Sequence, residues 1–272
     1  MTMKVKTNGI ELNYTVEGPE DGPVVVMSHS LASSHRMWDS QMPVLTDYRV
    51  YRFDTRGHGD SDAPDGPYSL DMLTDDARGL LDALGLEKVN FVGLSMGGMI
   101  GQMLAIKYPE VLLSATLCAT SSRMPKEAWP AWQERIDTAT AQGMDVLVDG
   151  TMERWFTDGF ISTNKSAIAP IRELVRSTTV QGYTSCIGAI MKLDITDRLT
   201  SIDLPTLVIA GENDESTPLA ANEAIHHAIA GSEFLPVPNA KHFVNIEQCK
   251  VVNDALSRFL ADQINGKAQT PE

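Results

Sequence analysis

The chain has 272 residues, of which 43% are hydrophobic, and it carries a formal net charge of −14 with a pI of about 4.8. This length can bury one large core, and the acidic charge argues against nucleic acid or an anionic membrane as a partner. The three cysteines form no paired framework, which is typical of reduced thiols in the cytosol. The N-terminus lacks the apolar segment of a secretory signal, and no run could span a membrane. We expect a cytoplasmic protein and leave its oligomeric state open.

Strand-like and helix-like segments alternate through the first 118 residues. Apolar alternation over 3–17 predicts a hairpin of two edge strands around Asn8 and Gly9. Buried strands are then expected at 24–27, 48–53, 89–94 and 112–118, and helices over 69–84 and 99–108. Because strands that alternate with helices pair in parallel, this pattern predicts a mostly parallel sheet with helices on both faces.

The alternation stops at Ser121 and returns near residue 204. Four helices are expected in between, over 126–141, 144–155, 165–180 and 183–193. Strands over 204–210 and 233–237, with helices over 219–229 and 247–260, complete an eight-stranded sheet. We therefore predict an α/β core of residues 1–121 and 197–265, an inserted helical cap over 122–196, and a frayed tail over 266–272.

One serine lies in a glycine-flanked turn between an apolar strand and an apolar helix. Gly93, Ser95 and Gly97 fit the pattern G-x-S-x-G, which is typical of the nucleophile elbow of α/β-hydrolases. Such a turn exposes the serine hydroxyl above the sheet edge and aims the free N–H groups of the next helix at a forming anion. The alternative is an ordinary strand–turn–helix with an incidental serine. The partner residues described next argue against it.

A serine hydroxyl becomes a nucleophile when a histidine takes its proton and an acid orients that histidine. In α/β-hydrolases these residues follow in the order serine, acid, histidine. Asp214 lies mid-loop after the strand at 204–210, and we choose it over Glu212 and Glu215, which we expect to face solvent. His242, in the loop after the last strand, is the expected base. The other five histidines precede the elbow or lie in a helix.

The reaction also needs hydrogen-bond donors for the negative oxygen of a tetrahedral intermediate. The first predicted donor is the backbone N–H of Met96, directly after the nucleophile. The second must come from the loop 28–34, which follows a central strand, and Leu31 is our choice.

Several stretches resemble one known family. They are Tyr51–Gly59, Asp65–Leu70, Gly93–Gly98 and, in the predicted cap, Trp132–Ile136, Met152–Thr157 and Gln181–Tyr183. Through them the chain resembles the α/β-hydrolase superfamily over nearly its whole length and, within it, the 3-oxoadipate enol-lactonases. The resemblance implies an α/β-hydrolase fold and hydrolysis of an enol-lactone in aromatic catabolism, through an acyl-enzyme on Ser95 and without metal or cofactor. Two residues depart from the family pattern, Ser30 in place of a glycine and Cys249 in place of a frequent proline.

The predicted substrate contacts lie in the cap. An enol-lactone that carries a carboxylate needs a cation in its pocket, and the sequence leaves four candidates open: Arg135, Arg154, Arg172 and Lys192. The cap aromatic and methionine side chains can equally form its core. As candidate substrate-binding residues we take Trp132, Trp155, Arg135 and Met191.

Three functions remain open, beside a fourth option, a C–C hydrolase acting on ring-cleavage products. The first is an enol-lactone hydrolase, and the second is a carboxylesterase or lactonase for small neutral acyl esters, with possible perhydrolase side activity. The third is a non-enzymatic small-molecule receptor of the same fold. Only the polarity of the pocket separates the first two, because the same three catalytic residues serve both.

Overall fold

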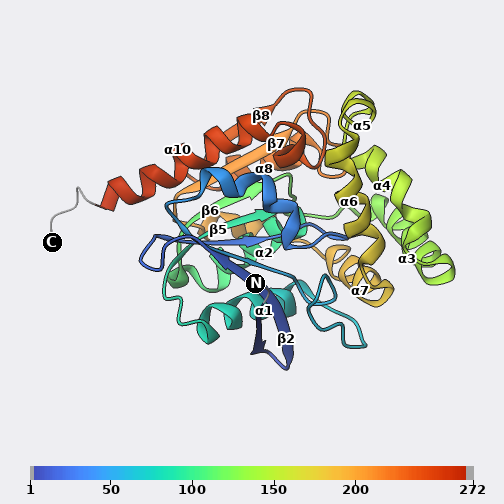
Figure 1. The fold of residues 1–272 in the computed structure, drawn as a ribbon, viewed down its shortest axis with the longest axis horizontal. Coiled ribbons are helices and arrows are strands. Elements are labelled where there is room, and N and C mark those ends of the chain that lie inside the picture. Colours follow the sequence, from blue (N-terminus) through green and yellow to red (C-terminus); the bar gives the residue numbers. More distant parts are fainter. Residues whose placement is uncertain (1–2, 268–272) are drawn as a thin grey trace.

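The computed structural model of the chain describes residues 3–267, in which eight strands form a single sheet (Figure 1). Along the sheet the strands follow the order β1-β2-β4-β3-β5-β6-β7-β8. Their bounds are β1 (Met3–Thr7), β2 (Ile10–Glu17), β3 (Val24–Ser28), β4 (Arg49–Phe53), β5 (Val89–Leu94), β6 (Leu112–Cys118), β7 (Thr206–Gly211) and β8 (Glu233–Val237). The two pairs β1–β2 and β2–β4 are antiparallel, and the other five are parallel. The predicted eight-stranded, mostly parallel sheet is confirmed.

The predicted N-terminal hairpin forms around Asn8 and Gly9, but of its two strands only β1 is an edge strand of the sheet. The strand β2 is longer than β1, and its second half, Tyr14 to Glu17, pairs with β4. The expectation of two edge strands is therefore wrong for β2, because pairing on both sides makes it an interior strand.

Helices cover both faces of the sheet. α1 (Leu70–Ala83), α2 (Met96–Lys107) and α8 (Leu219–Ala228) pack on one face, and α10 (Cys249–Lys267) packs against β6 and η1 (His35–Val44) on the other. The strand β5 is buried along its whole length, as expected for a central strand covered on both faces. The sheet core thus gives the loops at the carboxyl ends of its strands a fixed position.

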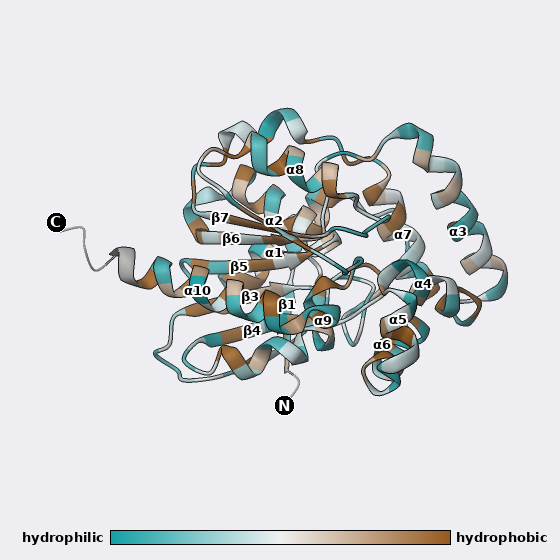
Figure 2. Ribbon diagram, turned by 90° about the horizontal axis from the view of Figure 1, so that it is seen from above, coloured by the Kyte–Doolittle hydropathy of each residue, from teal (hydrophilic) through white to brown (hydrophobic). Residues whose placement is uncertain are grey.

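The chain between β6 and β7 forms a group of helices that we call the cap helices. They are α3 (Trp129–Gln142), α4 (Val148–Trp155), α5 (Asp158–Thr163), α6 (Lys165–Ser177) and α7 (Val180–Ile190). Both views place them at one end of the sheet, away from the described end of α10 (Figures 1 and 2). The division into a core and an inserted cap with the bounds given above stays a prediction.

Short elements account for most differences from the predicted helices. The α5 helix and the 3₁₀ helices η1, η2 (Pro109–Val111) and η5 (Thr196–Ser201) were not predicted. The 3₁₀ turns η3 (Lys126–Ala128) and η4 (Asp145–Leu147) form the first turns of the predicted helices 126–141 and 144–155, and α9 (Val244–Glu247) is separate from α10. The last helix continues to Lys267, past the predicted end at 260. Of the predicted tail, residues 268–272 lie outside the described residues. Within residues 3–267, no helix combines the length and apolar character needed to cross a membrane.

Candidate active site

Ser95 lies at the turn between β5 and α2 in a strained backbone conformation. Its φ is 56° and its ψ is −114°, which an L-residue adopts only where its surroundings enforce it. A Cβ on Gly93 would come within 2.2 Å of the carbonyl oxygen of Gly97, and a Cβ on Gly97 within 2.2 Å of that of Ser28. Both flanking positions exclude a larger residue. This close approach of backbones explains the G-x-S-x-G pattern.

His242 and Asp214 come from the loops after β8 and β7 and form a buried pair. Nδ1 of His242 lies 2.8 Å from Oδ2 of Asp214. The other carboxylate oxygen accepts the backbone N–H groups of Ser216 at 2.7 Å and Thr217 at 3.1 Å. The hydroxyl of Thr217 donates to Oδ2 at 2.6 Å. Asp214 is thus fixed by its own loop, and its contact with Nδ1 leaves Nε2 of His242 available as an acceptor.

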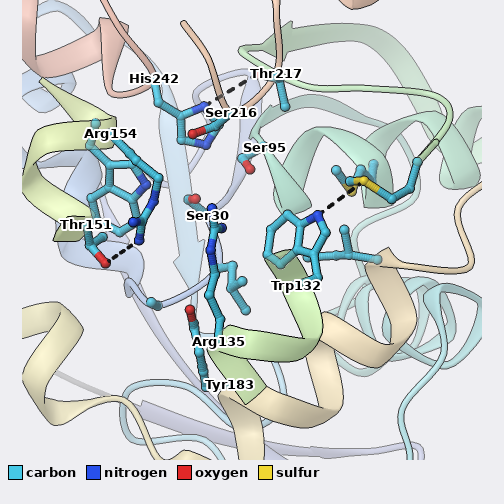
Figure 3. Close-up of a pocket in the computed structure, with 16 residues that line it drawn as sticks. Ser30, Ser95, Trp132, Arg135, Thr151, Arg154, Tyr183, Ser216, Thr217 and His242 are labelled. Atoms are coloured by element: carbon cyan, nitrogen blue, oxygen red, sulfur yellow. Dashed lines mark hydrogen bonds between the residues drawn. The ribbon is translucent and has the colours of Figure 1, made fainter. Parts of the chain in front are cut away.

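The competing acids and histidines occupy other positions. Glu212 and Glu215 are exposed, whereas Asp214 is only 4% exposed. His226 and His227 lie in α8. Ser95 and His242 line the same cavity and lie at the same end of it (Figure 3). No hydrogen bond joins these two side chains within residues 3–267; such contacts often tighten only when substrate binds.

Leu31 lines the cavity together with Ser95, and Met96 directly follows Ser95 in the chain. The N–H groups of Leu31 and Met96 have no acceptor within the described part of the chain. Nδ1 of His29 lies 2.7 Å from the carbonyl oxygen of Ser30, and Nε2 of His29 accepts the N–H of Thr55 at 2.8 Å. The second contact makes Nδ1 the protonated nitrogen. Because the Ser30 carbonyl and the Leu31 N–H share one planar peptide group, His29 fixes the direction of that N–H.

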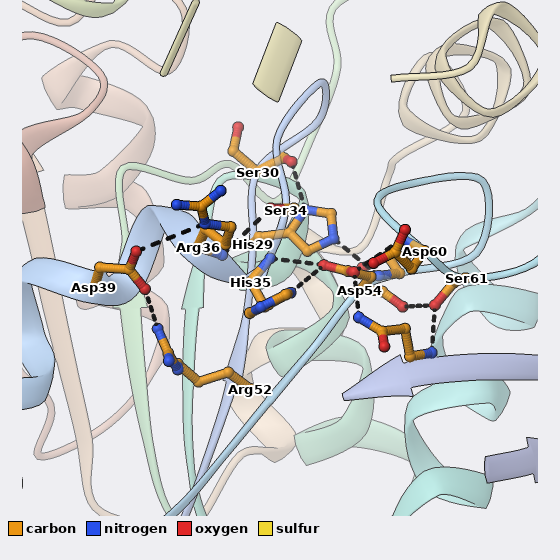
Figure 4. Close-up of polar contacts among 12 residues, drawn as sticks. His29, Ser30, Ser34, His35, Arg36, Asp39, Arg52, Asp54, Asp60 and Ser61 are labelled. Atoms are coloured by element: carbon orange, nitrogen blue, oxygen red, sulfur yellow. Dashed lines mark hydrogen bonds and ion pairs between the residues drawn. The ribbon is translucent and has the colours of Figure 1, made fainter. Parts of the chain in front are cut away.

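A cluster of buried polar residues supports the same loop (Figure 4). Nε2 of His58 accepts the N–H of Ala32 at 3.1 Å, and Asp54 accepts both the N–H and the Nδ1–H of His35 at 2.8 Å. Burial, followed by repulsion from His29, lowers the pKa of His58 to about 3. Burial also lowers the pKa of His29.

Burial acts on the pKa of the Asp54 carboxyl in the opposite direction from its effect on the two histidines. Burial alone would raise its pKa, but the hydrogen bonds and the charge of His35 outweigh burial and hold the pKa below its usual range. At neutral pH the cluster therefore contains neutral His29 and His58 with an ionised Asp54. That protonation pattern matches the hydrogen bonds observed.

The cavity above Ser95 is lined by residues from the loops and from α3, α4 and α7 (Figure 3). Of the predicted substrate contacts, Trp132, Trp155 and Arg135 line it, whereas Met191 does not and its neighbour Ile190 does. Lining residues not singled out from sequence as substrate contacts include Thr151, Tyr183, Met99, Met124 and Thr217. Tyr183 lies in a stretch that resembles the family, which is the one sequence signal that could have indicated it.

Two arginines face this cavity without a carboxylate partner among residues 3–267. Arg154 donates to the hydroxyl of Thr151 at 2.9 Å, and Arg135 lies over the Trp132 ring with its guanidinium carbon 4.6 Å from the centroid. Burial, followed by repulsion from Arg135, lowers the pKa of Arg154 to about 10. Of the other two candidate cations, Arg172 pairs with Asp149 and Lys192 lies outside the cavity. The cavity therefore carries two positive charges that no carboxylate of the described residues contacts.

The sequence matches a known family. A family profile described as the alpha/beta hydrolase fold matches residues 23–166, and one described as TAP-like protein matches residues 173–269. The chain is 36% identical to 3-oxoadipate enol-lactonase 2 of Acinetobacter baylyi over 252 residues, which cover 92% of this chain and 93% of that one.

Solved structures agree with the sequence match. An enol-lactonase from Burkholderia xenovorans superposes with a TM-score of 0.92 at 35% identity, covering 95% of this chain and 100% of that one. A thermophilic esterase from Thermogutta terrifontis superposes with a TM-score of 0.90 at 28% identity, covering 97% and 99%. The chain therefore belongs to the α/β-hydrolase family and is a carboxylic ester hydrolase.

Proposed function

We propose that this enzyme is a serine hydrolase that opens 3-oxoadipate enol-lactone through an acyl-enzyme on Ser95. The observation that carries the proposal is one cavity that contains Ser95, His242 and two arginines without carboxylate partners in the described chain. The similarity to enol-lactonases over more than nine-tenths of the chain supports the same substrate.

The first half of the reaction forms the acyl-enzyme. The Ser95 hydroxyl attacks the lactone carbonyl while Nε2 of His242 takes its proton, and Asp214 stabilises the resulting imidazolium. The N–H groups of Leu31 and Met96 donate to the negative oxygen of the tetrahedral intermediate. When the intermediate collapses, the ring C–O bond breaks and the enol oxygen leaves with the proton from His242. The enol then tautomerises to a ketone, still attached to Ser95 through the acyl group.

The second half releases the product. His242 takes a proton from a water molecule, whose oxygen attacks the acyl carbonyl. Collapse of the second intermediate breaks the bond to Ser95, which recovers its proton from His242. The products are the free acid and the unmodified enzyme, so the cycle uses water alone.

The two arginines favour an anionic substrate. Both side chains are partly buried, and a cation withdrawn from water without a carboxylate partner is unfavourable. A substrate carboxylate would supply the missing charge and hydrogen bonds. The alternative is a neutral acyl ester, which the apolar side chains of the cavity and the similarity to an esterase favour. The two functions differ in whether Arg135 and Arg154 are used.

The test compares two substrates with one set of variants. We expect Arg154→Met and Arg135→Met each to raise the KM for 3-oxoadipate enol-lactone on the order of 10- to 100-fold, the effect of losing a charged hydrogen bond. Turnover of p-nitrophenyl acetate should change little, because it carries no carboxylate. Arg172→Met, at a cap arginine already paired with Asp149, is the matched control. Steady-state kinetics on both substrates measure the difference.

Two outcomes would reject the proposal. Equal losses on both substrates would assign the arginines to the structure of the cap and favour the neutral ester. Binding of a ligand with negligible turnover that Ser95→Ala leaves unchanged would favour a receptor. We propose a cytoplasmic location as well, which the three unpaired cysteines support.

A further inference from the structure

Glu247 is a buried carboxylate between the cap helices and the loop that carries His242. It ends α9, is 8% exposed, and lies outside the cavity above Ser95. The proposed reaction does not use it. A carboxylate is rarely buried unless hydrogen bonds replace its water, so its contacts indicate what it does.

The two oxygens of Glu247 join two separate segments of the chain. Oε1 accepts the backbone N–H of Thr157 at 2.8 Å and also the Thr157 hydroxyl. Oε2 accepts the backbone N–H of Lys241 at 2.8 Å. Thr157 follows α4 and caps α5, whereas Lys241 directly precedes His242. One side chain thus binds the cap helices on one side and the base loop on the other.

Neighbouring contacts connect the same two segments. The N–H of Phe243 donates to the carbonyl of Trp155 at 3.1 Å, and Nζ of Lys241 donates to the carbonyl of Glu153 at 2.7 Å. The rings of Trp155 and Phe243 stack with centroids 3.9 Å apart. Residues on both sides of His242 are therefore attached to the end of α4, and Trp155 on that helix also lines the cavity.

We propose that Glu247 is a positioning residue that couples the cap helices to His242, so that the base and the substrate pocket keep one relative geometry. The inference rests on the proposed role of His242 as the base. Glu247 supplies three of the charged hydrogen bonds of this junction and the Lys241 ammonium supplies another, and such bonds are stronger than the neutral backbone contact between Phe243 and Trp155. Without the bonds to Glu247, the loop 241–243 keeps its backbone contacts to Trp155 but loses its fixed distance to Ser95.

Glu247→Gln is the sharpest variant, because it keeps the size of the side chain. All three groups that contact the carboxylate are donors, and two of them are backbone N–H groups that cannot rotate to accept. Whichever way the amide lies, its NH₂ faces one of these N–H groups. The substitution therefore removes one half of the link without creating a cavity.

The experiment measures p-nitrophenyl acetate kinetics and the rate at which a small neutral fluorophosphonate labels Ser95. Neither reagent needs the arginines, and both need an oriented base. We expect kcat and the labelling rate of Glu247→Gln to fall together on the order of 10- to 100-fold, as for a misplacement of about 1 Å. Glu233→Gln, which loses a carboxylate paired with Arg258 at the outer strand β8, is the matched control.

A purely structural role would give a different result. If Glu247→Gln lowers the melting temperature but keeps kcat and the labelling rate of the folded enzyme at the level of Glu233→Gln, the inference is wrong. Should Glu247→Gln not fold, Thr157→Val removes a hydroxyl that donates to Glu247 and also accepts the N–H of Phe160 at the start of α5, and it should lower both rates by a smaller factor. Unchanged rates in Thr157→Val would then overturn the inference.

His242→Ala, measured in parallel, separates this inference from the proposed function. If His242→Ala labels at the wild-type rate, the assignment of the base fails. If His242→Ala loses labelling while Glu247→Gln keeps it, only the coupling fails.

Discussion

At the scale of single residues, Asp214 shows how a loop prepares a carboxylate. Two backbone N–H groups and the Thr217 hydroxyl hold it from its own loop, and one oxygen remains in contact with Nδ1 of His242. Glu212 and Glu215, two and one residues away, have no such environment because they are exposed. Position within the loop, rather than charge alone, thus distinguishes the three acids.

We expect Asp214→Asn to lower kcat on the order of 10³- to 10⁴-fold, because an amide favours the wrong tautomer of His242. Glu212→Gln and Glu215→Gln should retain nearly full activity. Steady-state kinetics on p-nitrophenyl acetate, with circular dichroism to check folding, measure the three variants together. Near-normal activity of Asp214→Asn, with a large loss in either glutamate variant, would assign the acid to that glutamate instead.

Chain order made Ser95, Asp214 and His242 predictable as candidates, because each follows a strand that ends at the same edge of the sheet. Thr217 and Glu247 could not be predicted in the same way. Thr217 acts by donating its hydroxyl to Asp214, which the folded shape of the loop determines. The role of Glu247 depends on which N–H groups lie opposite its oxygens, and its partners are as far as 90 residues away along the chain. No local pattern in the sequence records such a contact.

At the scale of elements, the cap helix α7 touches the loop before α1 with its backbone. Its first turn meets this loop at Gly57, whose carbonyl accepts the Thr179 hydroxyl at 3.0 Å. A Cβ on Gly182 would come within 1.9 Å of the same carbonyl oxygen. The backbones therefore touch, and Tyr183 and Ile190 of α7 line the cavity from this anchored position.

Two glycines of α7 should respond to the same substitution with opposite signs. Gly182→Ala places a methyl group against a backbone that cannot yield easily, so it should lower the melting temperature and raise KM. Gly188→Ala has nothing within 4 Å of the new methyl group and should stabilise the helix by up to about 1 kcal/mol. Thermal unfolding and steady-state kinetics of both variants check this. A stabilising Gly182→Ala would show that α7 is not held at Gly57.

Segments with a regular apolar spacing followed their sequence patterns, whereas the 3₁₀ segments η1, η2 and η5 did not. The α1 helix was predicted within one residue at each end, because its apolar residues repeat at helical spacing and Ser69 caps it. The segment η1 contains Pro43 and is held by Gln41, which donates to Asn245 and Asn253 in the C-terminal region. Such a segment gains its shape from distant polar partners, so its own periodicity does not show it.

At the scale of the whole molecule, the buried histidines tie stability to pH. His29 and His58 are neutral in the folded protein, and burial lowers the pKa of both below the ordinary value of about 6.5. In the unfolded chain both regain that ordinary value. Below it, the unfolded state therefore binds more protons than the folded state, and stability must fall as the pH falls.

The window for this effect follows from the two states. For His58 the loss begins near the ordinary pKa of about 6.5 and continues down to its folded pKa of about 3. Asp54 also favours the folded state at high pH, since its pKa is lowered on folding, but its contribution is lost only below the ordinary carboxyl pKa of about 4. Between pH 6.5 and 4, the slope of the unfolding free energy against pH therefore reports the protonation of His29 and His58.

We expect the free energy of unfolding to fall in this window by up to about 1.4 kcal/mol per pH unit for each histidine that stays neutral in the folded state. His58→Gln keeps an oxygen that can accept the N–H of Ala32 and removes one titrating group. The slope of its unfolding free energy against pH should therefore be smaller, by close to the contribution of one bound proton. This holds even if its free energy of unfolding at pH 7 is lower. Urea unfolding at several pH values measures the slope, and His227→Gln, at an exposed histidine of α8, is the control. If the pH dependence of unfolding were unchanged in His58→Gln, His58 would bind a proton without unfolding the protein. The buried cluster would then tolerate a positive charge beside the loop 28–34.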